Sequence, residues 1–453
     1  MVNDPGQVTR PVAVVVGEAP RVDLVDDAVA PVMGSRARGG RRHGLGHAGM
    51  LPPGGPARPY TRPPVSRPPS SGRVRVGVAG LGAVAQAVHL PLLARLTDVF
   101  EIAAICDLSA GLRDALGERY NVGADVRFDS VERLLDEAPI DGLILLTSGS
   151  HGAAALAALD RDIPILCEKP LAYTVAEADR LAASPNADRL LLGYMKVFDP
   201  AVVEAGRVVA DPGAGLGERR AIEVAVLHPT SESQLGFAHL RPPPTDVDRE
   251  VVGAIRAATD GLVRAAIGPA ADALGDLYGG TLLSSVVHEL SVIRAVAGDL
   301  VAVDWADAWE ATPGTPGSVL LAGRLADGTR VTIGWHFLAD YPAYREDVRF
   351  HHVGGSVELR FPAPYRLHEP TRLRVSTGRN EVRREVAFDS IEEAFETELL
   401  AFRDLVRDGA PPRTGIADGR TDIGTCQRAI ARLAERRGIA IGGEAAALAA
   451  EAT

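Results

Sequence analysis

The chain has 453 residues, of which 46% are hydrophobic and 24% charged, a composition typical of globular proteins with room for two or three packed domains. Its net charge of −11 is unevenly spread, because residues 1–73 hold ten arginines and five acidic residues and so carry +5, which leaves −16 for the remainder. An acidic body argues against nucleic-acid partners, and no apolar run approaches the roughly 20 residues that span a bilayer. The three cysteines lie far apart without a metal-binding spacing, so we expect no disulfide, no metal site and a cytoplasmic location.

The first predicted segment is a tail. Residues 28–72 contain no acidic residue and are dense in proline, glycine and arginine, so we predict that residues 1–72 are disordered. Two alternatives stay open, a basic interaction arm and a segment that lies outside the translated protein.

Strands alternate with helices over residues 73–196. The predicted strands are 74–80, 100–107, 141–147, 164–170 and 188–196, and the predicted helices are 87–96, 109–120, 151–162 and 174–184. This alternation predicts an α/β Rossmann domain with a doubly wound parallel sheet.

Strands dominate the pattern of residues 197–440. The predicted strands are 219–229, 300–310, 317–325, 329–340, 346–355, 356–362, 371–378 and 381–389, and the helices are 250–268, 281–298, 391–409 and 417–438. These elements predict an α+β domain with a large open mixed or antiparallel sheet. An exposed sheet face favours a homo-dimer or homo-tetramer, and the Ala-rich residues 441–453 are expected to fray.

A glycine motif directly follows the first strand. Gly80, Gly82 and Ala85 form GxGxxA at the start of the first helix, where glycines permit a tight turn and close approach to a pyrophosphate. Asp107 ends the second strand, where its carboxylate would bind ribose hydroxyls and repel a 2′-phosphate. The motif therefore predicts NAD as cofactor, with NADP possible.

Three further stretches carry a family resemblance. Together with the glycine motif, "TSGSHGAAALAALDRDIPILCEKPLA" and "GYMKVFDP" resemble the glucose–fructose oxidoreductase, inositol dehydrogenase and rhizopine-catabolism (Gfo/Idh/MocA) family. The resemblance implies a second domain that binds substrate and forms oligomers, and a reaction at a carbinol of a sugar, cyclitol or related polyol. It places the following residues at the cofactor: Thr147, His151, Glu168, Lys169, Pro170 and Lys196.

Lys169 is the first catalytic candidate. When hydride leaves a carbinol carbon, a nitrogen within hydrogen-bond reach of the hydroxyl must take or share its proton, and a lysine can do this while stabilising alkoxide charge. For Lys196, an ion pair with a residue such as Asp199 is an alternative to a cofactor contact. His151 would either cap the following helix or line the cleft.

The helix at 281–298 carries the second candidate, His288. The family pattern here is G-x-L-x-D-x-G-x-H, and Gly280, Leu282 and His288 match it while Ser284 stands at the Asp position. A zinc pair would need a histidine where Val292 stands, so metal binding is excluded. His288 is then either an active-site residue or a structural one, and without the carboxylate its pKa should fall.

The predicted substrate residues are Lys169, Ser284, His288 and His336, the last from the second-domain sheet. The sequence favours an NAD-dependent oxidoreductase. Two alternatives remain open, a cofactor-binding regulatory protein without catalysis and a lyase or glycosidase that uses NAD transiently.

Overall fold

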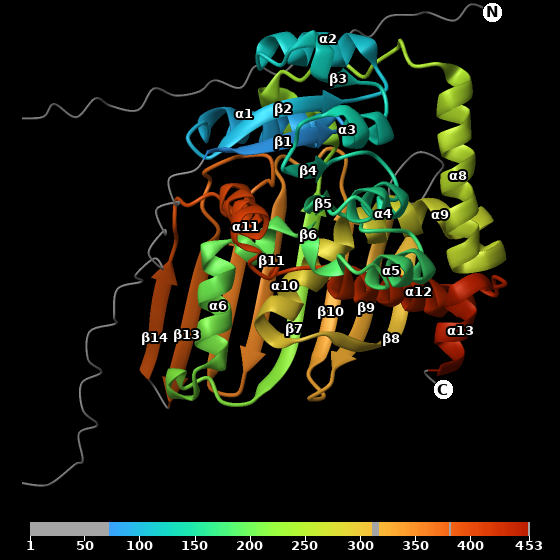
Figure 1. Cartoon of the computed structure of the whole chain (residues 1–453). Coiled ribbons are helices and arrows are strands. Elements are labelled where there is room, and N and C mark those ends of the chain that lie inside the picture. The colour runs from blue at the N-terminus through green and yellow to red at the C-terminus, as the bar shows by residue number, and fades with distance from the viewer. Residues whose placement is uncertain (1–71, 310–316, 380–381, 452–453) are drawn as a thin grey trace, which may run out of the picture. The chain divides into compact units, whose positions relative to one another are not determined.

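The computed structural model of the chain describes residues 72–309, 317–379 and 382–451. The predicted tail at 1–72 therefore lies outside the described residues, except for Gly72. Two sheets organise the described part, and Figure 1 shows the first in blue and green beside the second, whose long strands run from green to orange.

The first sheet is parallel, with strand order β3-β2-β1-β4-β5-β6. Its strands are β1 (Val74–Ala79), β2 (Phe100–Cys106), β3 (Arg127–Phe128), β4 (Gly142–Leu145), β5 (Ile165–Glu168) and β6 (Leu190–Gly193). The connecting helices are α1 (Leu90–Arg95), α2 (Ala110–Arg119), α3 (Val131–Glu137), α4 (Gly152–Leu159) and α5 (Val175–Ala182). The order reverses between β1 and β4, the position where open parallel sheets bind ligands beyond their strand ends.

The second sheet has eight strands in the order β14-β13-β12-β11-β7-β10-β9-β8. They are β7 (Arg219–His228), β8 (Leu300–Trp309), β9 (Ser318–Leu325), β10 (Arg330–Phe337), β11 (Arg345–His352), β12 (Gly355–Phe361), β13 (Arg372–Arg379) and β14 (Val382–Phe388). Only β7 and β10 pair in parallel, so the sheet is mixed as predicted. One face alternates buried residues against helices, as Ile222, Val224 and Val226 do on β7.

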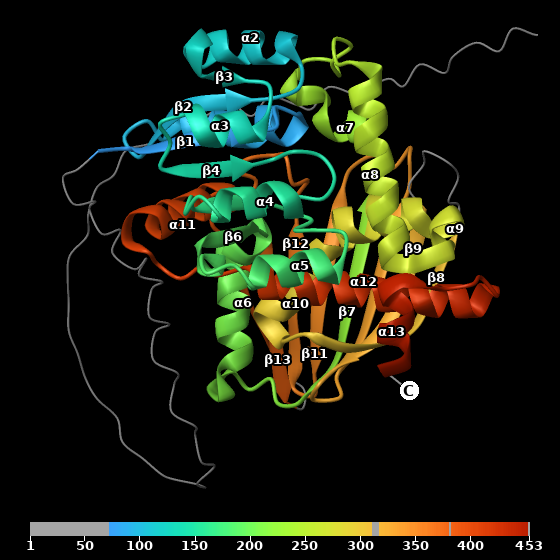
Figure 2. The same cartoon turned by 45° about the vertical axis from the view of Figure 1, so that its right-hand side comes forward.

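The remaining helices lie after β6 and around the second sheet. They are α6 (Pro200–Ala210), α7 (Ser231–Leu235), α8 (Arg249–Ile267), α9 (Ala271–Leu277), α10 (Val287–Ala297), α11 (Ala394–Asp408), α12 (Ile416–Arg437) and α13 (Gly443–Glu451). Figure 2 shows α6, α10 and α12 along one face of the second sheet. α11 follows the second sheet in sequence but packs on the first, where Phe402 touches Gly142 of β4.

One predicted strand is too long. The strand predicted over 188–196 ends at Gly193, and Met195–Phe198 form one 3-10 turn, because the N–H of Tyr194 turns back to the carbonyl of Leu192 at 2.8 Å. The helices α3, α6 and α9 were not expected from the pattern.

The chain end after residue 441 is not frayed over its described part. Gly443–Glu451 form α13, and the Glu444 carboxylate accepts the N–H groups of Val175 and Ala176 at 2.7 and 2.8 Å. It thereby stabilises the N-terminus of α5, a contact that only the folded chain creates.

The helical run Arg249–Ala297 is long and apolar enough by composition to cross a membrane, which the sequence pattern did not indicate. However, 67% of its apolar window is buried inside the protein, so packing against the other helices accounts for its hydrophobicity.

Candidate active site

The glycine turn after β1 has the geometry of a dinucleotide cradle. Gly80 has φ of +93°, and a Cβ there would lie 2.6 Å from the backbone of Leu146, so only glycine fits between β1 and β4. A Cβ on Gly82 would meet nothing within 4 Å, which leaves room for a phosphate beside the backbone. Ala85 follows as a buried residue at the start of a π-helical segment, Ala85–His89.

Asp107 holds the glycine turn in place. Its two carboxylate oxygens accept the N–H groups of Leu81 at 2.8 Å and Ser109 at 2.9 Å. A carboxylate can accept several hydrogen bonds, so capacity remains for ribose hydroxyls. The prediction that Asp107 lies beside the ribose of a bound dinucleotide is compatible with this geometry.

Lys169 follows β5 and is joined to Pro170 by a cis peptide bond. Its side chain is partly exposed, and Nζ donates a hydrogen bond of 2.6 Å to the carbonyl oxygen of Ser284. Burial and the charge of Lys196 lower the pKa of Lys169 from its ordinary value, although Glu168 and Glu289 oppose this. A lysine whose pKa is lowered exchanges its proton more readily near neutral pH.

Glu168 and His151 contact the backbone on either side of the Lys169–Pro170 peptide bond. Glu168 accepts the N–H of Lys169 at 3.0 Å, and its Oε1 lies 3.4 Å from Nε2 of His89. Burial raises the pKa of Glu168, but His89 and Lys169 lower it by more, so the pKa falls below its ordinary value. The two ring nitrogens of His151 lie 2.7 Å from the carbonyl oxygens of Thr147 and Pro170.

His151 stands at the N-cap position of α4, but its side chain makes no capping hydrogen bond and its ring is not exposed in the cleft. Its ring is buried and joins the chain after β4 to the chain after β5. Burial lowers the pKa of His151, and a neutral imidazole can donate to only one of its two carbonyls.

The helical segment that contains α10 places His288 one turn after the Ser284 carbonyl that binds Lys169. Tyr278–Val286 form a π-helical segment that continues into α10, and such segments are frequent at functional sites. The Ser284 hydroxyl donates to the carbonyl of Gly280, so the serine does not replace the missing carboxylate.

The environment of His288 disfavours its protonated form. Burial, Lys169 and Lys196 lower the pKa of His288 well below its ordinary value, in the direction that the missing carboxylate predicted. Its Nδ1 is enclosed and has no hydrogen-bond partner among the described residues, and the Tyr194 ring lies 6.3 Å away edge-on.

A buried ion cluster beside this helix was missed by the sequence reasoning. Nζ of Lys196 lies 3.2 Å from Oε1 of Glu289 and 2.5 Å from Oε2 of Glu346, and the Tyr344 hydroxyl donates to the same Glu346 oxygen at 2.5 Å. Phe361 packs its ring 5.2 Å from the ammonium. Lys196 is therefore engaged by carboxylates, although Asp199, the suggested partner, bonds instead to Thr371.

Opposite charges determine the titration of this cluster. Burial would lower the pKa of Lys196, but the two glutamates raise it, whereas burial and Glu346 raise the pKa of Glu289 to about 7. One signal could have revealed the cluster: Glu346 alternates in phase with the buried Val348 and Phe350, and a charge at an inward position needs a partner.

His336 is not part of the site. Trp335 on β10 faces the helices and donates from Nε1 to the Ser285 hydroxyl at 2.8 Å. Because neighbouring strand residues face opposite sides, His336 points to the other face, where it contacts the Trp309 ring at 5.7 Å. The expectation that His336 contacts substrate is therefore not supported.

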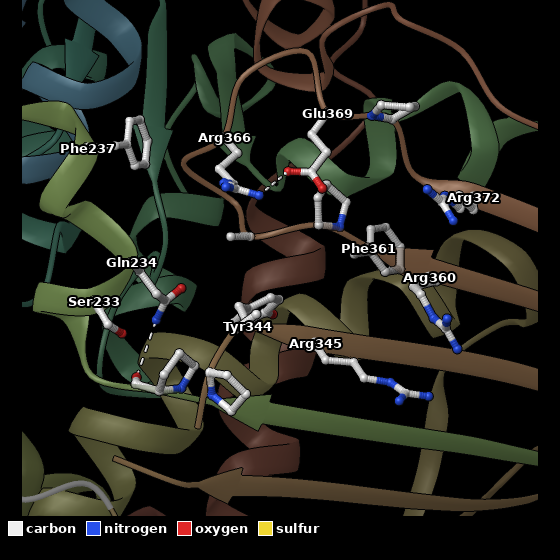
Figure 3. A pocket seen from close by; sticks show the side chains of 16 residues that line it. Ser233, Gln234, Phe237, Tyr344, Arg345, Arg360, Phe361, Arg366, Glu369 and Arg372 are labelled. Carbon is white, nitrogen blue, oxygen red and sulfur yellow. Dashed lines mark hydrogen bonds and ion pairs between the residues drawn. The ribbon is translucent and has the colours of Figure 1, made fainter. Parts of the chain in front are cut away.

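A cavity of about 440 Å³ adjoins the ion cluster and shares Tyr344 and Phe361 with it. Figure 3 shows Arg345, Arg360 and Arg372 on one side of this cavity and Phe237 on the other. A cavity of this size suits a small molecule, and its arginines and aromatic faces suit a polar ring.

Comparison with known proteins identifies the first domain. Residues 74–192 match the model of an oxidoreductase family with an NAD-binding Rossmann fold, the Gfo/Idh/MocA family. Residues 74–192 are thus similar to the NAD-binding Rossmann domain of this oxidoreductase family. The GxGxxA turn, Asp107 and the EKP triplet at Glu168–Pro170 all fall within this Gfo/Idh/MocA match.

Similar sequences include inositol 2-dehydrogenases. That of Salmonella typhimurium is 29% identical over 140 residues, which cover 30% of this chain and 41% of the relative. Inositol 2-dehydrogenase 2 of Paenarthrobacter aurescens is 27% identical over 281 residues, covering 59% of this chain and 70% of the relative. The chain thus matches less than half the length of the Salmonella protein.

Solved structures share the two-domain fold. An aldose-aldose oxidoreductase of Caulobacter crescentus has a TM-score of 0.59 at 20% identity, over 81% of this chain and 98% of its own. An oxidoreductase of Agrobacterium radiobacter, solved with NAD⁺, L-tartaric acid and magnesium, has a TM-score of 0.57 at 16% identity, over 81% and 98%. The likeness in fold to these solved structures therefore covers both sheets.

Proposed function

We propose that the protein is an NAD-dependent oxidoreductase acting on a carbinol of a sugar, a cyclitol or a related polyol. The observation that carries this proposal is the contact between Lys169 and the π-helical segment. The Lys169 Nζ donates a hydrogen bond to the carbonyl of Ser284, one turn before His288. Lys169 stands beyond β5, at the strand ends from which the glycine turn also projects. The inositol 2-dehydrogenases among the similar sequences support a ring-shaped polyol as substrate.

The chain's own groups suit this chemistry. NAD, when bound, supplies the carbon that accepts hydride. Lys169, partly exposed and with a lowered pKa, would donate a hydrogen bond to the reacting oxygen and take or share the hydroxyl proton. Burial and two nearby ammonium groups disfavour the protonated form of His288, so its ring would accept a hydrogen bond from the reacting hydroxyl or from a second one.

The test is a substrate panel with nucleotide binding measured in parallel. Purified protein would be supplied with NAD⁺ and a set of cyclitols and sugars, and with NADH and the corresponding ketones, while absorbance at 340 nm is followed. Reduction of NAD⁺ by at least one polyol is expected. Tight nucleotide binding without any reaction would instead indicate a regulatory protein.

A third outcome separates the remaining alternative. A bond-cleaving enzyme that uses NAD transiently would convert a substrate with no net absorbance change and would keep its nucleotide bound. Product analysis by mass spectrometry in the same reactions would detect it.

We also propose a homo-oligomer in the cytoplasm. β14 is the outer strand of the second sheet, and Val382 and Val386 on it are 65% and 63% exposed, a surface that association would cover. The three cysteines are free and buried, which suits a reducing compartment. Sedimentation velocity tests the first proposal, since a monomer at micromolar concentration would contradict it.

A further inference from the structure

A segment of the second domain, here called the strap, contacts the first domain beside the glycine turn and at the start of α2. The strap is residues 239–248, which lead from α7 to α8, and Figure 2 shows this connection beside α2. At its start the N–H of Arg241 donates to Oε1 of Gln86 at 2.9 Å, and Nε2 of Gln86 donates to the carbonyl of Leu81 in the glycine turn at 2.9 Å. Three prolines follow, which stiffen the chain.

The far end of the strap delivers a carboxylate to the start of α2. Oδ2 of Asp246 accepts the N–H of Gly111 at 2.8 Å. This hydrogen bond and the nearby Ser109 hydroxyl lower the pKa of Asp246. Negative charge is favoured at this helix end, because the first N–H groups of a helix have no partner within the helix and the helix dipole is positive there.

Two carboxylates therefore meet at one helix start. The N–H of Ser109 donates to Asp107 at 2.9 Å, and the N–H of Gly111, two residues later, donates to Asp246 at 2.8 Å. Asp107 belongs to the first domain and Asp246 to the strap, 139 positions later in the chain. A dinucleotide whose ribose hydroxyls reach Asp107 would bring a 2′-phosphate into the field of both carboxylates.

We propose that Asp246 is a specificity-determining residue that excludes NADP, so that the substrate domain, as well as Asp107, selects the cofactor. This rests on the proposed function only in taking NAD as the cofactor. Asp246 occupies the Gly111 N–H that would otherwise bind a phosphate oxygen and adds a second negative charge. Arg113 lies close by and donates to the carbonyls of Asp107 and Leu108 at 2.6 and 3.1 Å, so a cation is present once the carboxylate is removed.

The experiment measures dissociation constants for NAD⁺ and NADP⁺ by calorimetry on the full chain. The variants are Asp246→Asn, Asp107→Asn and the double variant. Asp248→Asn is the matched control, because Asp248 lies on the same strap but caps α8 through the N–H of Glu250 at 2.8 Å. We expect Asp246→Asn to tighten NADP⁺ binding about tenfold, as for a nearby charge in partly screened surroundings, with NAD⁺ changed less than about twofold.

The double variant should bind NADP⁺ more tightly than either single variant, and the gain should shrink as salt rises from 50 to 500 mM. An unchanged NADP⁺ affinity in Asp246→Asn, with NAD⁺ still bound, would overturn the strap proposal alone. If Asp246→Asn weakened the binding of NAD⁺ and NADP⁺ equally, the proposal would also be overturned, because Asp246 would then only stabilise the fold of the binding site. If the natural protein binds neither NAD⁺ nor NADP⁺, both the proposed function and the strap proposal are contradicted.

Discussion

Two lysines on neighbouring elements of the first domain have opposite environments. Lys169 is partly exposed, and the hydrogen-bond partner of its Nζ is the carbonyl of Ser284. Lys196 is buried between Glu289 and Glu346 and over the Phe361 ring. The pKa of Lys169 is lowered, whereas the pKa of Lys196 is raised.

The comparison suggests different roles for the two lysines, a structural one for Lys196 and a chemical one for Lys169. Lys196 has two carboxylates nearby, so its proton is held and it fixes the junction of α10 with the second sheet. Lys169 has no carboxylate that bonds its ammonium among the described residues, so its proton remains exchangeable. The positive charge of Lys196 also helps to lower the pKa of both Lys169 and His288.

The largest expected effect tests the structural half of the comparison. Lys196→Met leaves two buried carboxylates without their cation, so unfolding free energy should fall by about 3–5 kcal/mol. Removing Lys196 raises the pKa of Glu289 further above its unfolded value, and a raised carboxyl pKa means that stability is lost as pH rises toward it. Urea titrations should therefore show a larger deficit at pH 8 than at pH 5.

A second substitution sharpens this result. Lys196→Met combined with Glu346→Gln removes one of the stranded charges and should recover part of the loss. An unaltered deficit in the double variant, or a loss below about 1 kcal/mol in Lys196→Met, would show that the cluster does not hold the junction together.

The chemical half predicts a loss of turnover without a loss of stability. Lys169→Ala should lower kcat by about 100-fold or more, since positioned proton transfer contributes roughly 10² to 10⁴. Its melting temperature should stay close to that of the natural protein, because Lys169 is partly exposed. Steady-state kinetics and calorimetry on the same preparation check this, and a loss below tenfold would remove Lys169 from the mechanism.

A smaller effect is expected at Ser284. Ser284→Asp places a carboxylate one turn before His288, where it would raise the pKa of the imidazole against the lowering by burial and the two lysines. A histidine with a higher pKa stays protonated to higher pH, so the acid limb of kcat/KM should move upward by about one pH unit. Ser284→Asn is the uncharged control, and an equal shift in that variant would contradict the electrostatic explanation.

The sequence predicted the first domain closely because its signals are local. Buried strands of the right length, a glycine that must adopt φ of +93° and a carboxylate at the end of β2 are all set within a few tens of residues. The eight strands of the second sheet were also predicted, since alternation marks each strand separately. Gly80, Asp107 and Lys169 follow β1, β2 and β5, as the local patterns indicated, while their roles in binding and catalysis stay predictions.

Only the tertiary structure decided which side chains meet. The partners of Lys196 lie 93 and 150 positions away, the strap carboxylate comes from the second domain, and α13 is held through contacts to α5. The structure also decided that Trp335 of β10, and not His336, points toward the helices. A sequence pattern fixes periodicity and backbone conformation, but a buried charge finds its partner in space, and that choice is made by packing.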